Sequence, residues 1–282
     1  MLKSPASIWK FRFLSAMILV AGCASSSGVS TVAVENPAIS GRHARNIVIE
    51  QPELRLPDRA RLTYQIKWLG IPVGTLVNTI KGIRNFNGRQ CYVLESTMRT
   101  NFFFSAIFKV DDHFVSYMDV EKKHTLRHEA AVIEGSYSRR AAIDFDQERH
   151  NAYFKNFLNN SRKDFKIAPD VQDVVTAYYY LMLLPVVKVG DKIEFNGVNN
   201  ELNYKLTGVI HAKKFIKVPA FCGEHQRAFV VKINLIPSIK GRKIDEGKSD
   251  IYFSSAKERF PLFAVIKGPR FTEVTATLVK VE

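Results

Sequence analysis

Beyond its first 20 residues, this sequence has no apolar segment long enough to cross a membrane as a helix. Such a helix needs about 20 consecutive apolar residues, and after Val20 every apolar run is much shorter. The run at residues 13–20 is itself too short to span a bilayer. These absences exclude an integral helical membrane protein, although 46% of the residues are hydrophobic and can form a proper core.

The motifs of common enzyme classes are also missing. The sequence has no Gly-x-Ser-x-Gly turn for a serine nucleophile, no Gly-rich phosphate loop and no dinucleotide-binding fingerprint. Cys222 lies near His225, but a disulfide or a buried thiol explains this cysteine better than a catalytic pair. We therefore predict no catalytic residues, no enzyme activity and no cofactor.

The best metal-ligand candidates are His124 and His128, which lie four residues apart. On a helix two such side chains share a face, but this stretch has the pattern of a strand, in which they lie about 13 Å apart. Residues 111–113 (Asp-Asp-His) fit a strand entry with polar side chains better than a cation site or an acid–base group. We expect no metal site.

The first 22 residues have the features of a secretory signal peptide. Basic residues without acidic ones precede the apolar run, and small residues precede Cys23. Residues 20–23 (Val-Ala-Gly-Cys) resemble the lipobox of bacterial lipoproteins. The resemblance implies cleavage before Cys23 and a diacylglycerol on its sulfur, so that the protein is held at a membrane by its lipid.

The predicted location is the cell envelope, with a lipid anchor. Ala24 after the cysteine favours the periplasmic face of the outer membrane over the inner membrane, by the sorting pattern of enteric-type lipoproteins. Residues 23–59 include three prolines and lack steady periodicity, which is typical of a flexible tether. Residues 60–282 are predicted to form a single β-rich domain.

Acidic residues are in short supply. The 27 aspartates and glutamates stand against 41 lysines and arginines, which gives a formal net charge of +14. No nucleic-acid-binding module accompanies this charge, and an exported protein does not normally meet DNA, so nucleic acid is not an expected partner. A basic surface attracts lipid headgroups, lipopolysaccharide phosphates or wall polymers. The alternative is a solvated basic surface in a host with a basic proteome.

With Cys23 assigned to lipid, Cys91 and Cys222 remain. They are an even number of cysteines in a compartment that permits disulfides. A bond between them would close a long loop and stabilise the fold by a few kcal/mol. Two buried free thiols in strands are the alternative.

From Leu62 onward the pattern is that of β-strands. Leu62, Tyr64, Ile66 and Trp68 alternate with polar residues, which is the period of a half-buried strand. Roughly a dozen such stretches follow, separated by turn residues. The pattern predicts a mainly β fold, with an antiparallel and strongly curved sheet or a β-barrel-like domain.

One principal amphipathic helix is predicted at about residues 171–184. Asp170 is placed to cap its N-terminus, and Pro185 ends it. Six apolar residues share one face at helical spacing, and Tyr179 and Tyr180 leave that face for a rim. A single helix of this kind in a β protein packs on a sheet or plugs the mouth of a barrel.

Residues 101–108 (Asn-Phe-Phe-Phe-Ser-Ala-Ile-Phe) are densely apolar. They fit a short helix at one end of a sheet or a buried strand, and we expect them in the core, since an exposed version would face a membrane or a ligand. We expect aromatic residues to line a ligand cavity. They are Trp68, Phe102, Phe103, Phe104 and Tyr178.

Four blocks of the chain carry a family resemblance. They are residues 62–74, 108–119, 173–181 with 189–191, and 251–254 with 259–261. Their order resembles that of bacterial exported proteins grouped as domain of unknown function 3108. The resemblance covers residues 62–281 and implies a mostly antiparallel β fold and an envelope location, with no assigned activity. The chain departs from the pattern at residues 255–257, where an acidic residue is common.

Three functions remain open. The leading one is a non-enzymatic envelope lipoprotein that binds a lipid or another anionic envelope component in a cavity, by fold-level analogy with periplasmic lipid carriers. The second is a scaffold or protein partner of an envelope or polysaccharide assembly machine, which predicts a surface patch. The third is an unrecognised hydrolase, which predicts a polar cleft with clustered acidic groups and a histidine.

Overall fold

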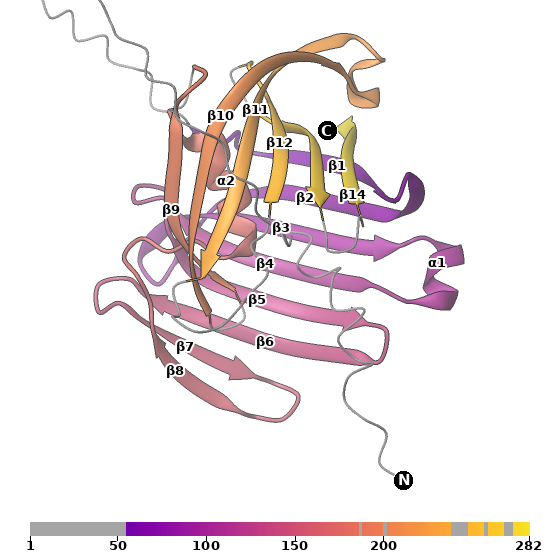
Figure 1. Ribbon diagram of the computed structural model, residues 1–282. Helices are drawn as coiled ribbons and strands as arrows, with labels where there is room; N and C mark the ends of the chain where they lie inside the picture. Colours follow the sequence, from indigo (N-terminus) through magenta and orange to yellow (C-terminus); the bar gives the residue numbers. More distant parts are fainter. Residues whose placement is uncertain (1–54, 186–187, 200–201, 238–247, 257–258, 268–272) are drawn as a thin grey trace, which may run out of the picture.

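The computed structural model describes residues 55–185, 188–199, 202–237, 248–256, 259–267 and 273–282 (Figure 1). The predicted signal peptide, Cys23 and most of the predicted tether lie outside these residues.

Fourteen strands form one sheet in the order β8-β7-β6-β5-β4-β3-β2-β1-β14-β13-β12-β11-β10-β9. The elements of the first half are β1 (Ala60–Trp68), β2 (Ile71–Phe86), β3 (Arg89–Thr100), α1 (Phe102–Ile107), β4 (Asp111–Asp119), β5 (Thr125–Glu134), β6 (Tyr137–Asp146), β7 (Asn151–Asn156) and β8 (Arg162–Lys166). Those of the second half are α2 (Val174–Leu183), β9 (Lys192–Asn199), β10 (Leu202–Lys217), η3 (Pro219–Phe221), β11 (His225–Pro237), β12 (Lys248–Ser254), β13 (Pro261–Lys267) and β14 (Glu273–Val281).

The sheet consists of two series of hairpins joined by one long-range pair. Strands β1 to β8 follow one another in space, as do β9 to β14, and β1 pairs with β14. All neighbouring strands run antiparallel. Strands β8 and β9 are the two ends of this order, so the sheet is strongly curved but not closed. In Figure 1 the long strands β10 and β11 arch over the first half, with α2 between the two halves. The predicted antiparallel, curved β fold is confirmed.

Cys91 and Cys222 are free, so the predicted disulfide is wrong for this structure. Cys91 is buried on β3, and Cys222 is exposed after η3, which packs on β14. Strands β1 and β2 lie between β14 and β3 in the sheet, whereas a disulfide needs Cα atoms within about 7 Å. Burial, together with the charge of Asp119, raises the pKa of the Cys91 thiol to about 11, which keeps it protonated.

Helix α2 begins at Val174, later than predicted, and its N-cap is Asp173, not Asp170. Asp170 has a left-handed backbone (φ 52°), and its carboxylate lies 3.0 Å from Nδ1 of His124. The residues between Asp170 and the helix stay extended because they pair with other segments. The backbone N–H of Thr125 donates to Val171, and Gln172 forms a parallel bridge with Gly197.

The helix is buried almost all round. Eight of its ten residues are buried, including the completely enclosed Tyr179, and the partly buried Tyr180 packs against the same core. The prediction that these two tyrosines border a rim is therefore wrong. The main apolar core joins α2 to side chains from both halves of the sheet, such as Leu94 on β3 and Ile210 on β10. The helix fills the concave side of the curved sheet.

A buried polar cluster fixes the start of α2. Oδ1 of Asp173 accepts hydrogen bonds from the backbone N–H groups of Val175 (2.7 Å) and Thr176 (3.2 Å) and from the hydroxyl of Ser116 on β4 (2.9 Å). Nδ1 of His128 on β5 lies 3.3 Å from the same oxygen. Burial alone would raise the pKa of Asp173, but His128 and these hydrogen bonds hold it below the usual value. The charged cap therefore ties the helix to the sheet.

The substitution Asp173→Asn is expected to lower the free energy of unfolding by about 1–3 kcal/mol, because it removes a buried charge that several donors share. Asp170→Asn is the matched control, since the Asp170 side chain is 79% exposed and an asparagine oxygen there can still meet Nδ1 of the buried His124, so an effect of at most about 1 kcal/mol is expected. The stability that Asp173 contributes is complete above the ordinary aspartate pKa and is lost as pH falls through the lowered folded pKa. Urea unfolding from pH 7 to pH 2 should show a larger loss in the wild-type protein than in the Asp173 variant, in which other carboxylates with a lowered pKa, such as Glu95, still titrate. Equal effects of the two substitutions at pH 7 would contradict this role of Asp173.

Candidate functional site

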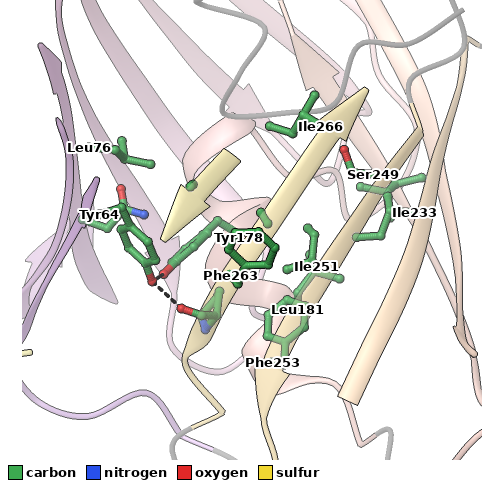
Figure 2. Close-up of a pocket in the computed structure, with 15 residues that line it drawn as sticks. Tyr64, Leu76, Tyr178, Leu181, Ile233, Ser249, Ile251, Phe253, Phe263 and Ile266 are labelled. Atoms are coloured by element: carbon green, nitrogen blue, oxygen red, sulfur yellow. Dashed lines mark hydrogen bonds between the residues drawn. The ribbon is translucent and has the colours of Figure 1, made fainter. Parts of the chain in front are cut away.

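An apolar cavity of about 80 Å³ lies between α2 and strands β10 to β14 (Figure 2). Its wall also includes side chains from β1 and β2, and the cavity is partly open to solvent. Polar atoms enter the wall at few positions. The side chains that define it best are Leu181, Ile233, Ile251, Phe253, Phe263 and Ile266. Such a lining favours an apolar ligand, since it offers little to a polar one.

A chain of hydrogen bonds forms one end of this cavity. The Tyr64 hydroxyl donates to the carbonyl of Pro261 (2.8 Å), so the Tyr178 hydroxyl, 2.6 Å away, must donate to Tyr64. The side chain of Asn78 hydrogen-bonds to Tyr178 in turn. Burial raises the pKa values of both tyrosines, which keeps the hydroxyls neutral. The hydroxyl protons of this pair are thus committed to protein acceptors.

Ser249 supplies a polar group that no described residue pairs with. Its side chain is 2% exposed and lines the cavity, and its hydroxyl oxygen has no hydrogen-bond partner among the described residues. On the sheet Ser249 lies opposite Ile233 and Ile266, and Figure 2 shows it well apart from the tyrosine pair. A buried hydroxyl without a partner costs free energy, so a ligand with a polar atom at this point would gain from it.

Of the five aromatic residues expected around a cavity, only Tyr178 lines it. Trp68, Phe102 and Phe103 are exposed, and Phe104 packs against a second core around Leu62 and Tyr64. By the alternation of β1, Trp68 would face inward like Tyr64 and Ile66. It lies instead at the end of the strand, past a register shift between Ile66 and Lys67, and is exposed. The strands β11 to β13 supply much of the wall, and their apolar alternation in the sequence was the signal that could have indicated it.

The expectation that residues 101–108 lie in the core is wrong. They form the six-residue helix α1, and none of its residues is buried. The helix joins β3 to β4 beyond the ends of these strands, where no other layer covers it in the described part of the chain. Its side chains are considered below as a surface.

The two histidines weighed as metal ligands serve different partners. His124 faces Asp170, whereas Nδ1 of His128 lies 2.9 Å from the hydroxyl of Ser116 and 3.3 Å from Asp173. Among the described residues, no group of three or more His, Cys, Asp or Glu side chains is placed to hold a metal ion. Ser116 and Asp173 both approach the same ring nitrogen, whereas a Ser-His-Asp relay uses opposite nitrogens. The cluster has the geometry of a helix anchor.

Asp112 on β4 is a completely buried carboxyl group near Glu134 of β5. Its Oδ1 accepts from the backbone N–H of Ile133 (3.1 Å), and its Oδ2 has no hydrogen-bond partner among the described residues. Burial and then the charge of Glu134 raise the pKa of Asp112 to about 7. The group is thus mostly protonated in mildly acidic solution.

An open antiparallel sheet around one buried helix, with a small apolar cavity beside that helix, defines a β-barrel-like domain. The chain belongs to the family described as "Protein of unknown function (DUF3108)", which matches residues 63–269. This agrees with the resemblance of the four sequence blocks. No curated protein matches the chain.

Solved structures match this chain as well. One is a β-barrel-like protein of domain of unknown function DUF1849 from Brucella abortus, which matches with a TM-score of 0.53 and 10% identity over 81% of this chain and 98% of that chain. Another is a protein from Bacteroides fragilis NCTC 9343 that is provisionally described as exported and has a YmcC-like fold. It matches with a TM-score of 0.35 and 7% identity over 81% of this chain and 98% of that chain. The first likeness supports the fold alone. In the described residues, no helix is long and apolar enough to cross a membrane.

The substitution Asp112→Asn is expected to stabilise the protein at pH 8 by about 1–3 kcal/mol and to have little effect at pH 4. The folded pKa lies above the unfolded one, so the stability due to this carboxyl is complete at low pH and falls as pH rises toward 7. Thermal unfolding across this pH range measures the difference. Asp111→Asn, at the partly exposed neighbour that pairs with Arg99, is the control. An Asp112 variant less stable than wild type at pH 8 would refute the assignment.

Proposed function

We propose that the protein is a lipid-anchored envelope protein without catalytic activity that binds the apolar chain of an envelope lipid. The observation that carries the proposal is the apolar cavity beside α2, with a neutral tyrosine pair at one end and the unused hydroxyl of Ser249 in its wall. The lipobox-like sequence ending at Cys23 supports anchoring, on the periplasmic face of the outer membrane.

The size of the cavity limits how a ligand is held. An apolar cavity of about 150 Å³ stays dry and binds benzene, and this cavity measures about 80 Å³. It therefore takes a segment of an acyl or isoprenoid chain, while the rest of the chain leaves through the open side. Binding a longer segment requires the partly buried Phe263 and Ile266 on β13 to move. These side chains have the freedom to do so, unlike the enclosed residues of the main core.

The positive net charge of the protein suits the headgroup of such a lipid. The formal net charge is +14, and a basic surface attracts phosphate or carboxylate headgroups at moderate ionic strength. The apolar wall contributes binding free energy, at about 25 cal/mol per Å² of apolar surface removed from water. The headgroup would remain at the surface, where water and lysine or arginine side chains solvate it.

The substitution Ala276→Phe is expected to fill the cavity and abolish retention of lipid. Ala276 lines the cavity from β14, and a phenyl ring at this position occupies the space that a chain would use. Thr275→Phe is the matched control, because adjacent strand residues point to opposite faces of the sheet and Thr275 lies opposite Lys67 and Val265, neither of which lines the cavity. Chains starting at Ala24 keep every described element, so they can be purified from an envelope-containing host and extracted with organic solvent for mass spectrometry.

A stoichiometric phospholipid, fatty acid or isoprenoid in the wild type and in Thr275→Phe, but absent from Ala276→Phe, is the expected result. Near-equal melting temperatures of the three proteins would show that the loss is not due to unfolding, since overpacking costs about 1–3 kcal/mol. Recovery of the wild-type protein without lipid would contradict the proposal.

A further inference from the structure

Large apolar side chains are exposed together at one edge of the sheet. We call this group the apolar rim: Trp68, Leu69 and Ile71 of the β1–β2 turn with Phe102, Phe103 and Ile107 of α1. Phe102 is 95% exposed, and Phe103 and Ile107 are 68% and 69% exposed. In Figure 1 the β1–β2 turn and α1 lie at the right-hand edge of the molecule.

Hydrogen bonds hold the two parts of the rim together. Asn101 caps α1 by accepting from the backbone N–H of Phe104 (2.9 Å). Its own backbone N–H donates to Val73 (2.8 Å), and its side-chain amide donates to Pro72 (2.8 Å), both at the start of β2. The helix that carries the phenylalanines is therefore fixed to the turn that carries Trp68.

The rim continues onto the β5–β6 hairpin. The ring of Phe108 packs so closely on Gly135 that a Cβ there would lie 2.7 Å from it, and the Gly135 N–H donates to Lys109 (2.8 Å). Exposed Ile133 and Tyr137 flank this glycine. A contiguous apolar edge on a rigid support is uncommon on monomeric soluble proteins and marks an interaction surface.

Exposed charges beside the rim are mainly basic. Lys109 and Arg140 are exposed next to α1 and the β5–β6 hairpin. The carboxylates at this edge are largely neutralised or hidden: Asp111 pairs with Arg99 (2.8 Å), and Glu134 is buried. Glu273 is exposed near Leu69, but its partner across the β13–β14 pair is the exposed Lys267. The edge thus combines apolar tips with positive charge.

We propose that the apolar rim docks on an anionic lipid bilayer, with its phenylalanines inserted at the boundary between headgroups and acyl chains. Tryptophan and tyrosine are enriched at this boundary, and basic side chains beside it gain from anionic headgroups. The apolar residues lie on turns and on the six-residue helix α1, so their side chains project separately from the edge of the sheet. Separate projecting side chains fit a fluid lipid bilayer better than the groove of a protein partner.

The rim and the cavity share one edge of the sheet. Ile266 of the cavity wall pairs with Val274, and Val274 pairs with Trp68 of the rim. A bilayer at the rim would therefore present its acyl chains at the end of the strands that enclose the cavity. Docking does not depend on cavity binding, so the two proposals can fail separately.

The test uses flotation of the chain from Ala24 onward with vesicles of equal parts phosphatidylethanolamine and phosphatidylglycerol. Wild type is expected to float with these vesicles, and more weakly with phosphatidylcholine vesicles or in 1 M salt, where the Debye length falls to about 3 Å. Phe102→Ser and Phe103→Ser should each weaken partitioning about tenfold, because each removes a large inserted side chain. Tyr153→Ser, at an exposed aromatic residue on β7, is the control and should float as wild type does.

Unchanged flotation of the phenylalanine variants, or no flotation of wild type, would overturn the proposal. So would a wild-type dimer that dissociates in Phe102→Ser without any lipid effect, since that result assigns the rim to a second copy. The cavity variant Ala276→Phe is expected to float normally. If it loses extractable lipid yet still floats, docking stands on its own evidence.

Discussion

The buried carboxylate of Asp173 is the point on which the arrangement of the two halves of the sheet depends. It caps α2 and meets Ser116 and His128 from β4 and β5, so the helix is held on the concave side of the first half. The same helix then packs against β9 to β12 of the second half through the main core. A sheet whose end strands do not pair keeps its curvature because a helix, not a closing strand, fills the interior. The cap thus also determines where the cavity beside Tyr178 lies.

An open sheet filled by one helix differs in its capabilities from a closed barrel. The wall at β13 is only partly buried, and one neutral tyrosine pair and one unused hydroxyl interrupt an otherwise apolar surface. The two histidines near α2, in contrast, have structural partners: His128 contacts the helix cap, and His124 contacts Asp170. In the described part of the chain, the apolar features that outside molecules can reach are the cavity and the rim at one edge of the sheet. Both features are compatible with a protein that contacts lipid.

The sequence was sufficient to predict the elements that have a repeating local pattern. It was not sufficient to predict features that depend on contacts between distant segments. Alternation in β1 and the apolar face of α2 predicted a curved antiparallel sheet with one principal helix. The choice between Asp170 and Asp173 as cap could not be read, because it depends on Ser116 and Thr125, which are 57 and 48 residues away. The apolar density of residues 101–108 suggested burial, but no local pattern shows that a connection projects beyond its sheet. Likewise, the alternation that placed Tyr64 on the apolar face of a strand did not indicate its position in the cavity wall.

The central claim is that an acyl chain occupies the cavity between α2 and strands β10 to β14. Its most direct test is photo-cross-linking of the purified protein with a diazirine-bearing fatty acid, followed by mapping of the modified peptides by mass spectrometry. The account predicts modification of the α2 peptide that contains Tyr178 and Leu181 and of the β12 and β13 peptides that contain Phe253 and Phe263. An excess of unlabelled fatty acid should suppress these products. Modification confined to the outer face of the sheet or to α1, with α2 unmodified, would contradict the claim.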